Sequence, residues 1–520
     1  MNREKHIETL SNTAIWDIII IGGGATGLGT AVDAASRGYK TLLLERFDFA
    51  KGTSSRSTKL VHGGVRYLAQ GDISLVLEAL HERGLLKKNA PHLVKNQEFI
   101  IPTYKRWRGP FYALGMKVYD MMSGKLGLGP SERLSKKETL EAIPNLSKKG
   151  LLGGVVYQDG QFDDARLAIN LAQTASEYGA TMLNYIEVTK LLKSDDEMIQ
   201  GVNCIDKETQ KQHHIRGKVV INATGVFVDT ILQMDNPKQP KIVCPSQGVH
   251  IVLESSFLQS DAAIMIPKTD DGRVLFAVPW HNKVVVGTTD TAIKEATEEP
   301  RALEQEVKFI LKTAADYLQK APKRKDVLSI FAGLRPLAAP QGNEESTKEI
   351  SRGHKLMVSL SGLVTITGGK WTTYRKMAED TINKAVMVAG LEEQKCVTKR
   401  LLIHGYKKKV DRNNHLYFYG SDKKKLNKLL KANPKLAEQL HSKLPFIKAQ
   451  VVWAVRHEMA RTVEDVLSRR TRALLLDAQS SIEMASEVAK IMAKELGKDN
   501  SWRKSQVKQY TELANGYLLK

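Results

Sequence analysis

The sequence predicts a mixed α/β (α+β) fold in three parts: a domain with a parallel sheet, a domain with an antiparallel sheet and a helical C-terminal domain. A strand–helix–strand unit within residues 16–45 indicates the first part. Short strand-like runs between residues 249 and 286 indicate the second, and the loss of strand alternation after about residue 399 indicates the third. The chain has 520 residues, which exceeds the size at which a single core stops growing, so more than one domain is expected.

The N-terminal unit has the order of a Rossmann-like fold. Residues Trp16–Ile21 form an apolar, β-branched run, and Thr41–Leu44 form a second apolar run. A helical pattern from Thr30 to Arg37 lies between them, and glycines open that helix. This order predicts two parallel strands joined by a crossover helix.

The glycines have the spacing of a dinucleotide site. Gly22, Gly24 and Gly27 form G-x-G-x-x-G, which allows a tight turn and a close approach of the backbone to a pyrophosphate. The helix N-terminus that follows offers free N–H groups to the phosphates. Glu45 ends the second strand, where a carboxylate can accept hydrogen bonds from ribose hydroxyls. Glycine turns also recur by chance, so the strands, the helix and the acid around the motif carry the prediction.

The motif alone does not separate FAD from NAD, but two distant segments favour FAD. Ala223 and Gly225 close a later strand, and Gly369 and Lys370 lie in another glycine loop before a helical stretch. In flavoproteins of the two-dinucleotide-binding type, such segments return to cover the cofactor. Only one G-x-G-x-x-G is present, so we expect the substrate itself to reduce the flavin.

The remaining chain mixes helical and strand-like segments. A loop rich in Ser, Thr, Gly and His covers residues 46–67, and His213 and His214 lie on a polar hairpin where we expect them to face solvent. Helices are expected at Ile73–Asn89, Ala165–Tyr178, Leu303–Leu318, Val451–Ser468, Ala473–Leu496 and Trp502–Leu519. Strands are expected at Thr181–Leu192, Val249–Leu253, Val274–Val278 and Lys283–Val286, and two more flank a turn within residues 201–221.

The chain is strongly basic but has no nucleic-acid motif. Its net charge is +21, and residues 400–520 alone hold 25 Lys/Arg against 12 Asp/Glu. Such a surface attracts nucleic acid, anionic lipid or an anionic substrate, or is simply a solvated helical surface. No zinc-finger or RRM signature accompanies the charge, so no nucleic-acid partner is expected.

Cysteine usage indicates a reducing interior, and the hydropathy of the chain predicts neither a membrane span nor a signal peptide. The three cysteines are far apart and form no C-x-x-C pair, and no histidine–carboxylate cluster has metal spacing, so neither disulfides nor a metal are expected. No stretch approaches the roughly 20 apolar residues of a membrane span. The first sixteen residues lack the apolar core of a signal peptide, and we expect a cytoplasmic protein.

Four motifs resemble the signature of the quinone-linked, FAD-dependent glycerol-3-phosphate dehydrogenases. They are GTSSRSTKLVHGGVRYL at residues 52–68, GTTD at 287–290, AGLRPL at 332–337 and GGKWTTYR at 368–375. Their order and spacing match over roughly residues 15–380, and the helical C-terminus resembles the family's cap. The wider family includes glycine and D-amino-acid oxidases, which lack the H-G-G-x-R-Y run. The family pattern has a smaller residue where Trp371 stands.

The resemblance implies a Rossmann-like FAD-binding domain of the D-amino-acid/glycine oxidase type. The predicted domains are residues 15–90, 151–235 and 335–390 for FAD binding, 91–150 and 236–334 for the antiparallel-sheet substrate domain, and 391–520 for the helical C-terminal domain. It also implies oxidation of sn-glycerol 3-phosphate to dihydroxyacetone phosphate, with electrons passed to a quinone at the inner face of the cell membrane. An oxidase that reduces oxygen to hydrogen peroxide is the alternative, and a homodimer is left open.

Two residues are candidates for the chemistry. Oxidation of the C2 alcohol requires loss of the hydroxyl proton, which a neutral imidazole can accept near neutral pH. His250 follows a glycine in a strand-like run. Its sequence context alone favours a core histidine bonded to a backbone carbonyl, whereas the resemblance implies the catalytic base. Arg335, in the AGLRPL motif, would stabilise the developing alkoxide.

The substrate phosphate requires fixed cations, and the planar fork of arginine suits it best. The resemblance implies that Arg66, Tyr67, Arg352 and Lys370 hold the phosphate. Taken singly, each cation also fits a solvated surface charge.

The predicted cofactor contacts lie in the glycine motif, at the ends of two strands and in three of the four motifs. Serines of the first motif would donate to the pyrophosphate or the flavin edge, although serines also form turns, and His62 would shape the flavin loop. The full predicted set is Gly22, Gly24, Gly27, Glu45, Ser54, Ser55, Ser57, His62, Gly63, Ala223, Gly225, Asp290, Gly369, Lys370 and Thr372.

One segment is a candidate membrane contact. Residues 105–112 combine cations with Trp107, Phe111 and Tyr112, and an apolar-rich stretch follows. Such residues suit the membrane interface, and they suit packing into the substrate domain equally well. A different class of function is a basic nucleic-acid-binding protein with a vestigial nucleotide fold, which predicts a colourless protein and salt-dependent DNA binding.

Overall fold

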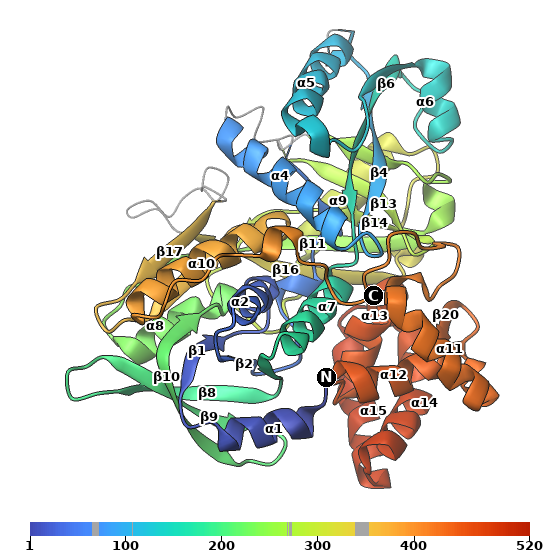
Figure 1. Ribbon diagram of the computed structural model, residues 1–520. Coiled ribbons are helices and arrows are strands. Elements are labelled where there is room, and N and C mark those ends of the chain that lie inside the picture. Colours follow the sequence, from blue (N-terminus) through green and yellow to red (C-terminus); the bar gives the residue numbers. More distant parts are fainter. Residues whose placement is uncertain (65–71, 107, 268, 270–272, 339–352, 520) are drawn as a thin grey trace.

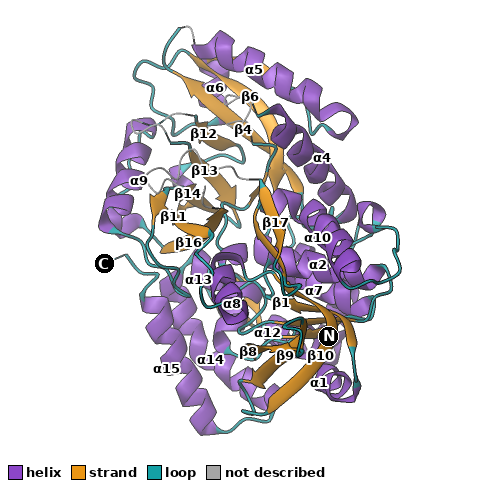
Figure 2. Cartoon of the chain, turned by 90° about the vertical axis from the view of Figure 1, so that its left-hand side faces the viewer, coloured by secondary structure: helices purple, strands orange, loops and turns teal. Residues whose placement is uncertain are grey.

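Two large sheets and a cluster of C-terminal helices make up the molecule (Figure 1). The structure is a computed structural model and describes residues 1–64, 72–106, 108–267, 269, 273–338 and 353–519. In the perpendicular view the first sheet lies beside α1, and the C-terminal helices α14 and α15 run along the opposite edge (Figure 2).

The first sheet contains the predicted nucleotide-binding unit. Its order is β17-β18-β10-β1-β2-β7, and β8 and β9 extend β10 as an antiparallel meander. Ile18 of β1 lies opposite Thr41 on one side and Val219 on the other, in parallel register. The strands are β1 (Trp16–Ile21), β2 (Thr41–Leu44), β7 (Thr181–Leu183), β8 (Ile186–Lys193), β9 (Ile199–Asp206), β10 (Gln212–Asn222), β17 (His354–Val358) and β18 (Val364–Gly368).

The side chains of β1 enter two separate cores, because successive strand residues point to opposite faces. Ile18 and Ile20 pack with the helices on one face, and Ile19 and Ile21 pack with the meander and α8 on the other. Both faces are therefore covered, which explains the uninterrupted apolar run in the sequence. The helices are α1 (Arg3–Asn12), α2 (Ala25–Ser36), α7 (Asp164–Glu177), α8 (Val228–Asp235) and α10 (Tyr374–Val388).

The second sheet is antiparallel except where β12 pairs with β4. Its β11–β16 ladder places His250 opposite Phe331 and Ser246 opposite Arg335. The strands are β3 (Leu60–Val61), β4 (Lys95–Thr103), β5 (Glu132–Ser135), β6 (Gly153–Gln161), β11 (Val243–Glu254), β12 (Ala263–Ile266), β13 (Leu275–Trp280), β14 (Lys283–Gly287), β15 (Thr291–Ala292) and β16 (Ser329–Ala338). The helices beside it are α4 (Ile73–Asn89), α5 (Arg108–Ser123), α6 (Lys136–Ala142) and α9 (Glu304–Tyr317).

The C-terminal helices pack against both sheets. Their core includes Trp280 and Phe331 of the second sheet, while Trp453 joins the core of the first. Buried Asp48 also accepts hydrogen bonds from Arg469 and Arg470. The elements are α11 (Lys423–Ala432), β19 (Gln439–His441), β20 (Leu444–Ile447), α12 (Lys448–Glu458), α13 (Ala473–Leu476), α14 (Ala478–Leu496) and α15 (Asn500–Asn515). The exact domain boundaries stay a prediction.

Two predicted elements are broken by left-handed residues. The helix expected at Val451–Ser468 ends at Glu458, because Met459 adopts a φ of 52°, and a π-helical segment at Asp465–Arg470 follows. The strand expected at Thr181–Leu192 is interrupted at Tyr185, where φ is 59°. Side-chain chemistry gives no warning of either break.

His213 corrects another expectation. It is buried, whereas His214 is exposed, because β10 alternates inward and outward residues through the hairpin. Within the described residues, no helix combines the length and the apolarity that crossing a membrane requires.

Candidate functional site

Two neighbouring cavities form one elongated hollow between the sheets. The strand-end cavity, of about 250 Å³, has Gly22, Glu45 and Ala223 in its wall. The His250 cavity, of about 280 Å³, has His250 and Arg335 in its wall. The residues that line both are Thr53, Pro336, Gly368, Gly369, Lys370 and Trp371.

The predicted glycine motif forms the turn at the strand-end cavity. Gly22 has a φ of +110°, and a Cβ there would lie 2.6 Å from the carbonyl oxygen of Ala223. A Cβ on Gly27 would lie 1.9 Å from the Gly22 carbonyl oxygen. The start of α2 can therefore pack this closely against the end of β1 only because position 27 has no side chain. Gly24 is the N-cap of α2, and as a glycine it has no side chain that could cap the helix. The helix therefore directs its first N–H groups and positive dipole end toward the cavity wall.

Glu45 lies in the same wall. Its carboxylate accepts hydrogen bonds from the backbone N–H groups of Gly23, at 2.6 Å, and Phe47, at 2.8 Å. Burial raises the pKa of Glu45, and these two N–H groups oppose that rise. Each carboxylate oxygen has further lone pairs, so the group can still accept ribose hydroxyls.

These features fit a dinucleotide cofactor. The helix N-terminus suits a pyrophosphate, the carboxylate suits a ribose, and Gly225, with nothing within 4 Å of its missing Cβ, leaves room in the same wall. Ala223 and Gly369 complete the predicted contacts on this side. The second cavity continues the hollow, so a dinucleotide at the strand end would extend toward His250.

The three predicted serines of the loop formed by residues 52–64 have different surroundings. Ser54 Oγ accepts a hydrogen bond from the Ala25 N–H at 2.8 Å and so binds the first turn of α2. Ser57 lines the His250 cavity and donates to Asp164 Oδ2 at 2.7 Å. Ser55 is buried, donates to the Gly52 carbonyl and lines neither cavity.

The end of this loop is hydrogen-bonded to the 3₁₀ turn Trp371–Thr373, which precedes α10. His62 and Thr372 exchange hydrogen bonds through the His62 backbone, at 3.2 and 3.3 Å, and both residues line the His250 cavity. Gly63 donates its N–H to Tyr119 at 2.8 Å, and a Cβ there would lie 2.4 Å from Leu80. Gly63 thus permits close packing beside the cavity.

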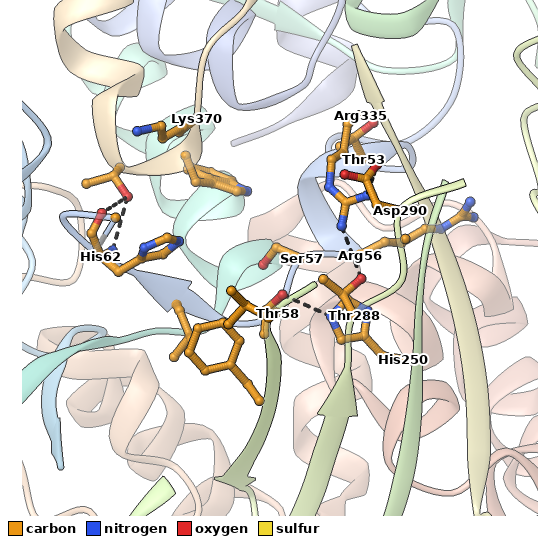
Figure 3. A pocket seen from close by; sticks show the side chains of 18 of the residues that line it. Thr53, Arg56, Ser57, Thr58, His62, His250, Thr288, Asp290, Arg335 and Lys370 are labelled. Carbon is orange, nitrogen blue, oxygen red and sulfur yellow. Dashed lines mark hydrogen bonds and ion pairs between the residues drawn. The ribbon is translucent and has the colours of Figure 1, made fainter. Parts of the chain in front are cut away.

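His250 points into its cavity from β11 (Figure 3). Its Nε2 lies 2.9 Å from Thr58 Oγ1, and its ring stacks on Phe331 with centroids 4.9 Å apart. Gly287 makes this possible, since a Cβ there would lie 2.4 Å from the imidazole. Burial, together with the positive charges of Lys59 and Arg335, holds the pKa of His250 well below its usual value. The ring is therefore neutral at pH 7.

Arg335 lies beside His250 on the neighbouring strand β16. Its Nη2 donates to Thr288 Oγ1 at 3.1 Å and to the Thr289 carbonyl at 3.0 Å, and Nη1 lies 3.6 Å from Asp290. A Cβ on Gly248 would lie 2.4 Å from the guanidinium, so the side chain of Arg335 can occupy this position only because residue 248 is a glycine. The predicted cofactor contact Asp290 thus lines the cavity and orients Arg335.

Lys370 enters the hollow from another side. It precedes the 3₁₀ turn Trp371–Thr373 and lines both cavities. In Figure 3 it lies with His62 on one side, while Arg335 and His250 lie on the other. The other predicted phosphate ligands, Arg66, Tyr67 and Arg352, lie outside the described residues.

The sequence reading missed several cavity residues. Thr58 lines the His250 cavity, and it lies with the buried Lys59 inside the motif that carried the resemblance. Nothing in that motif connects either residue to His250. Arg56 and Arg273 also line the His250 cavity. Trp371, which stands where the family pattern has a smaller residue, donates its indole N–H to the Ser54 carbonyl at 2.9 Å. Its side chain therefore stabilises the loop of residues 52–64.

Comparisons with known proteins agree with this geometry. A family model described as FAD dependent oxidoreductase matches residues 17–375, and one described as the C-terminal domain of alpha-glycerophosphate oxidase matches residues 364–503. The mitochondrial glycerol-3-phosphate dehydrogenase of Mesocricetus auratus is 41% identical over 549 aligned residues, which cover 98% of this chain and 74% of that protein.

Solved structures support the same grouping. The glycerol-3-phosphate dehydrogenase from Bacillus halodurans, complexed with FAD, superimposes with a TM-score of 0.81 at 30% identity and covers 99% of this chain and 97% of its own. Glycine oxidase from Geobacillus kaustophilus, at 20% identity, has a TM-score of 0.53 and covers 75% of this chain and 99% of its own, a likeness of fold alone. The predicted fold class is confirmed.

Proposed function

The chain belongs to the FAD-dependent oxidoreductases, and we propose that it oxidises sn-glycerol 3-phosphate to dihydroxyacetone phosphate. The observation that carries the proposal is the placement of His250, Arg335 and Lys370 around one cavity that continues into the dinucleotide-binding wall. The named relatives that align along almost the whole chain are glycerol-3-phosphate dehydrogenases, which supports this choice of substrate.

His250 accepts the proton of the C2 hydroxyl. The ring is neutral and buried, and Thr58 fixes the direction of Nε2. FAD, when bound, supplies the acceptor for the hydride that leaves C2. Once protonated, the imidazolium faces the positive charges of Lys59 and Arg335, which favour release of the proton after each turnover.

Arg335 stabilises negative charge on the C2 oxygen. Its guanidinium is oriented by Thr288, Thr289 and Asp290 before the substrate binds, so little reorganisation is required during the reaction. Lys370, together with Arg66 and Tyr67 of the first motif and with Arg352, binds the substrate phosphate.

A membrane quinone is the proposed electron acceptor, and the protein is proposed to be a cytoplasmic one bound peripherally to the inner face of the membrane. Helix α5 supports this placement because Phe111, Leu114, Val118 and Met121 repeat on one face and are all exposed. The opposite face is packed, with Met116 and Tyr119 buried. Exposed Lys105, Arg106 and Lys117 supply the cations that an anionic lipid surface attracts.

Product and acceptor together test the proposal. With glycerol 3-phosphate and a quinone analogue, the purified protein should form dihydroxyacetone phosphate while oxygen uptake stays at background. Peroxide formation as fast as quinone reduction would favour the oxidase alternative. Formation of no product with either acceptor would contradict the proposed function.

A colourless protein with steep salt-dependent DNA binding would support the alternative that the chain is a nucleic-acid-binding protein, which its family membership disfavours.

Light scattering of the purified protein would decide between a monomer and the homodimer that the sequence leaves open.

A further inference from the structure

Lys59 is a buried lysine for which the proposed reaction uses only the charge. Burial lowers the pKa of its ammonium group to about 7, although the carboxylate of Asp164 opposes that change. The Lys59 side chain is 0% exposed. Its Nζ donates to Asp164 Oδ2 at 2.7 Å and to the Ser55 carbonyl at 2.8 Å. The residue adopts a φ of +66°, in the left-handed region that side chains rarely occupy. Such a conformation persists only where surrounding contacts hold it, and the two hydrogen bonds of Nζ supply that hold.

Two contacts connect Lys59 to the ring of His250. The preceding residue, Thr58, brings its Oγ1 to within 2.9 Å of His250 Nε2. Lys59 Nζ also lies 5.2 Å from the centroid of the Phe331 ring, which stacks on the imidazole at 4.9 Å with an interplanar angle of 14°. The cation thus supports both the hydrogen-bonding edge and the packed face of the histidine.

The C-terminal domain completes the anchor. Arg472 donates through Nη2 to the same Ser55 carbonyl and to Asp164 Oδ1, both at 2.8 Å. Ser57 donates to Asp164 as well. The carboxylate of Asp164 thereby accepts hydrogen bonds from three side chains, those of Lys59, Ser57 and Arg472. The loop that carries Thr58 is thus connected to the C-terminal domain.

We propose that Lys59 is a positioning residue for the base: anchored by Asp164 and the Ser55 carbonyl, which Arg472 also binds, it sets the backbone of Thr58 so that the threonine hydroxyl holds the His250 ring in its working orientation. The role of His250 as the base belongs to the proposed function, and this inference rests on it.

The charges around His250 give the inference a measurable signature. Lys59 and Arg335 face the ring, Asp164 and Arg472 lie behind Lys59, Asp290 pairs with Arg335, and Lys370 lines the same cavity. Since the positive charge of Lys59 lowers the pKa of His250, removal of that charge must raise it. A residue that only filled space would leave this pKa unchanged.

The test compares Lys59→Met, Lys59→Gln, Thr58→Val and the double variant Thr58→Val/Lys59→Met, all loaded with FAD. The rate of anaerobic flavin reduction by glycerol 3-phosphate is measured from pH 5.5 to 9, and the His250 ring is titrated by ¹⁵N-histidine NMR without substrate. Lys59→Met should slow reduction about tenfold or more, since a small misplacement of a catalytic group costs that much. Lys59→Gln keeps a hydrogen-bond donor and should recover part of the rate.

The titration and the double variant supply the decisive comparisons. In both Lys59 variants the His250 titration should move to higher pH. The double variant should be no slower than the slower single variant, because both changes break one linkage. Lys283→Met is the matched control: it removes an ion-paired lysine from β14, next to β11, and should alter neither readout.

Three results would overturn the inference. They are an unshifted His250 titration in both Lys59 variants, rate losses that multiply in the double variant, and loss of FAD from both Lys59 variants while Thr58→Val keeps it. If glycerol 3-phosphate does not reduce the wild-type flavin, the proposed function fails, and the NMR titration still measures the effect of Lys59 on His250.

Discussion

Ser54 Oγ lies 2.8 Å from the backbone nitrogen of Ala25, and this hydrogen bond fastens the cofactor loop to the first turn of the nucleotide-binding helix. The missing side chain of Gly24 leaves room for it, since a Cβ there would lie 3.2 Å from the same oxygen. The glycine turn and the serine loop, which are distant in the sequence, therefore form one surface.

Replacement of Gly24 should remove the cofactor. In Gly24→Val the branched side chain displaces Ser54 and covers the helix N–H groups, so we expect loss of bound FAD with much of the fold retained. Flavin absorbance per protein and far-UV circular dichroism measure the two effects. Gly115→Ala in α5, where a Cβ meets nothing within 4 Å, is the control. Normal flavin content in Gly24→Val would be inconsistent with the cofactor assignment.

Removal of the base should slow the reaction without loss of flavin. His250→Ala should reduce the rate of anaerobic flavin reduction by about a hundredfold or more. In the wild type, protonation of His250 should cause no loss of rate from pH 8 down to 6.5, because burial holds the pKa of His250 well below its usual value. Stopped-flow absorbance measures both. An unchanged rate in the variant would move the role of base to another residue, with His62 next to test.

Loss of the phosphate cations should be specific to phosphorylated substrate. Lys370→Ala and Arg66→Ala should weaken the use of glycerol 3-phosphate much more than that of glycerol, because a desolvated charged contact is lost. The ratio of kcat/KM for the two substrates measures the effect. Lys355→Ala on β17, a nearby exposed cation, is the control. Equal losses for both substrates would show that these residues do not read the phosphate.

The exposed face of α5 should govern membrane binding. Phe111, Leu114 and Met121 are 60%, 67% and 80% exposed, and their joint replacement by Ser should weaken the binding of anionic vesicles and activity with membrane quinone. Activity with a soluble dye should be unchanged. The earlier candidates Trp107 and Tyr112 are less informative, since Trp107 lies outside the described residues and Tyr112 packs partly inward.

A matched control sharpens that test. Val358, Leu360 and Met387 are exposed apolar residues outside α5, and their joint replacement by Ser should leave vesicle binding unchanged. If vesicle binding survives the α5 change, the basic C-terminal domain becomes the better candidate for the membrane contact.

One histidine should make stability depend on pH. His404 lies between Asp422 and Glu177, at 2.6 Å from each, and although burial opposes it, these carboxylates raise its pKa to about 9. Because the folded pKa exceeds the unfolded value near 6.5, the stabilisation is complete below pH 6.5 and disappears as the pH rises through 9. It amounts to roughly 2 kcal/mol after screening.

Thermal unfolding of His404→Gln measures this contribution. The variant should be less stable than the wild type at pH 6 and nearly equal to it at pH 9.5. His214→Gln, at an exposed position of β10, is the control. A stability difference that is the same at both pH values would exclude the ion pairs as its cause.

The parts of the site that the sequence predicted are local in the chain. The glycines before α2 and Glu45 at the end of β2 lie within one strand–helix–strand unit, and their spacing reports the geometry directly. His250 and Arg335 were identified through motifs of the resembling family rather than from physical patterns. Without that resemblance, His250 reads as an ordinary core histidine.

The parts that the sequence did not predict depend on distant contacts. Asp164 lies 105 positions from Lys59 and 308 from Arg472, and an ion pair across such distances leaves no periodic signal. The left-handed backbone conformations of Lys59 and Met459 could not be predicted from the sequence either, since neither residue type favours them. Tertiary packing alone brings these groups together.

The central claim is tested most directly by adding glycerol 3-phosphate to the purified yellow protein without air. We expect stoichiometric loss of flavin absorbance near 450 nm, with one dihydroxyacetone phosphate formed per FAD and no comparable loss with glycerol. A flavin that stays oxidised with glycerol 3-phosphate, yet is reduced by dithionite, would contradict the account.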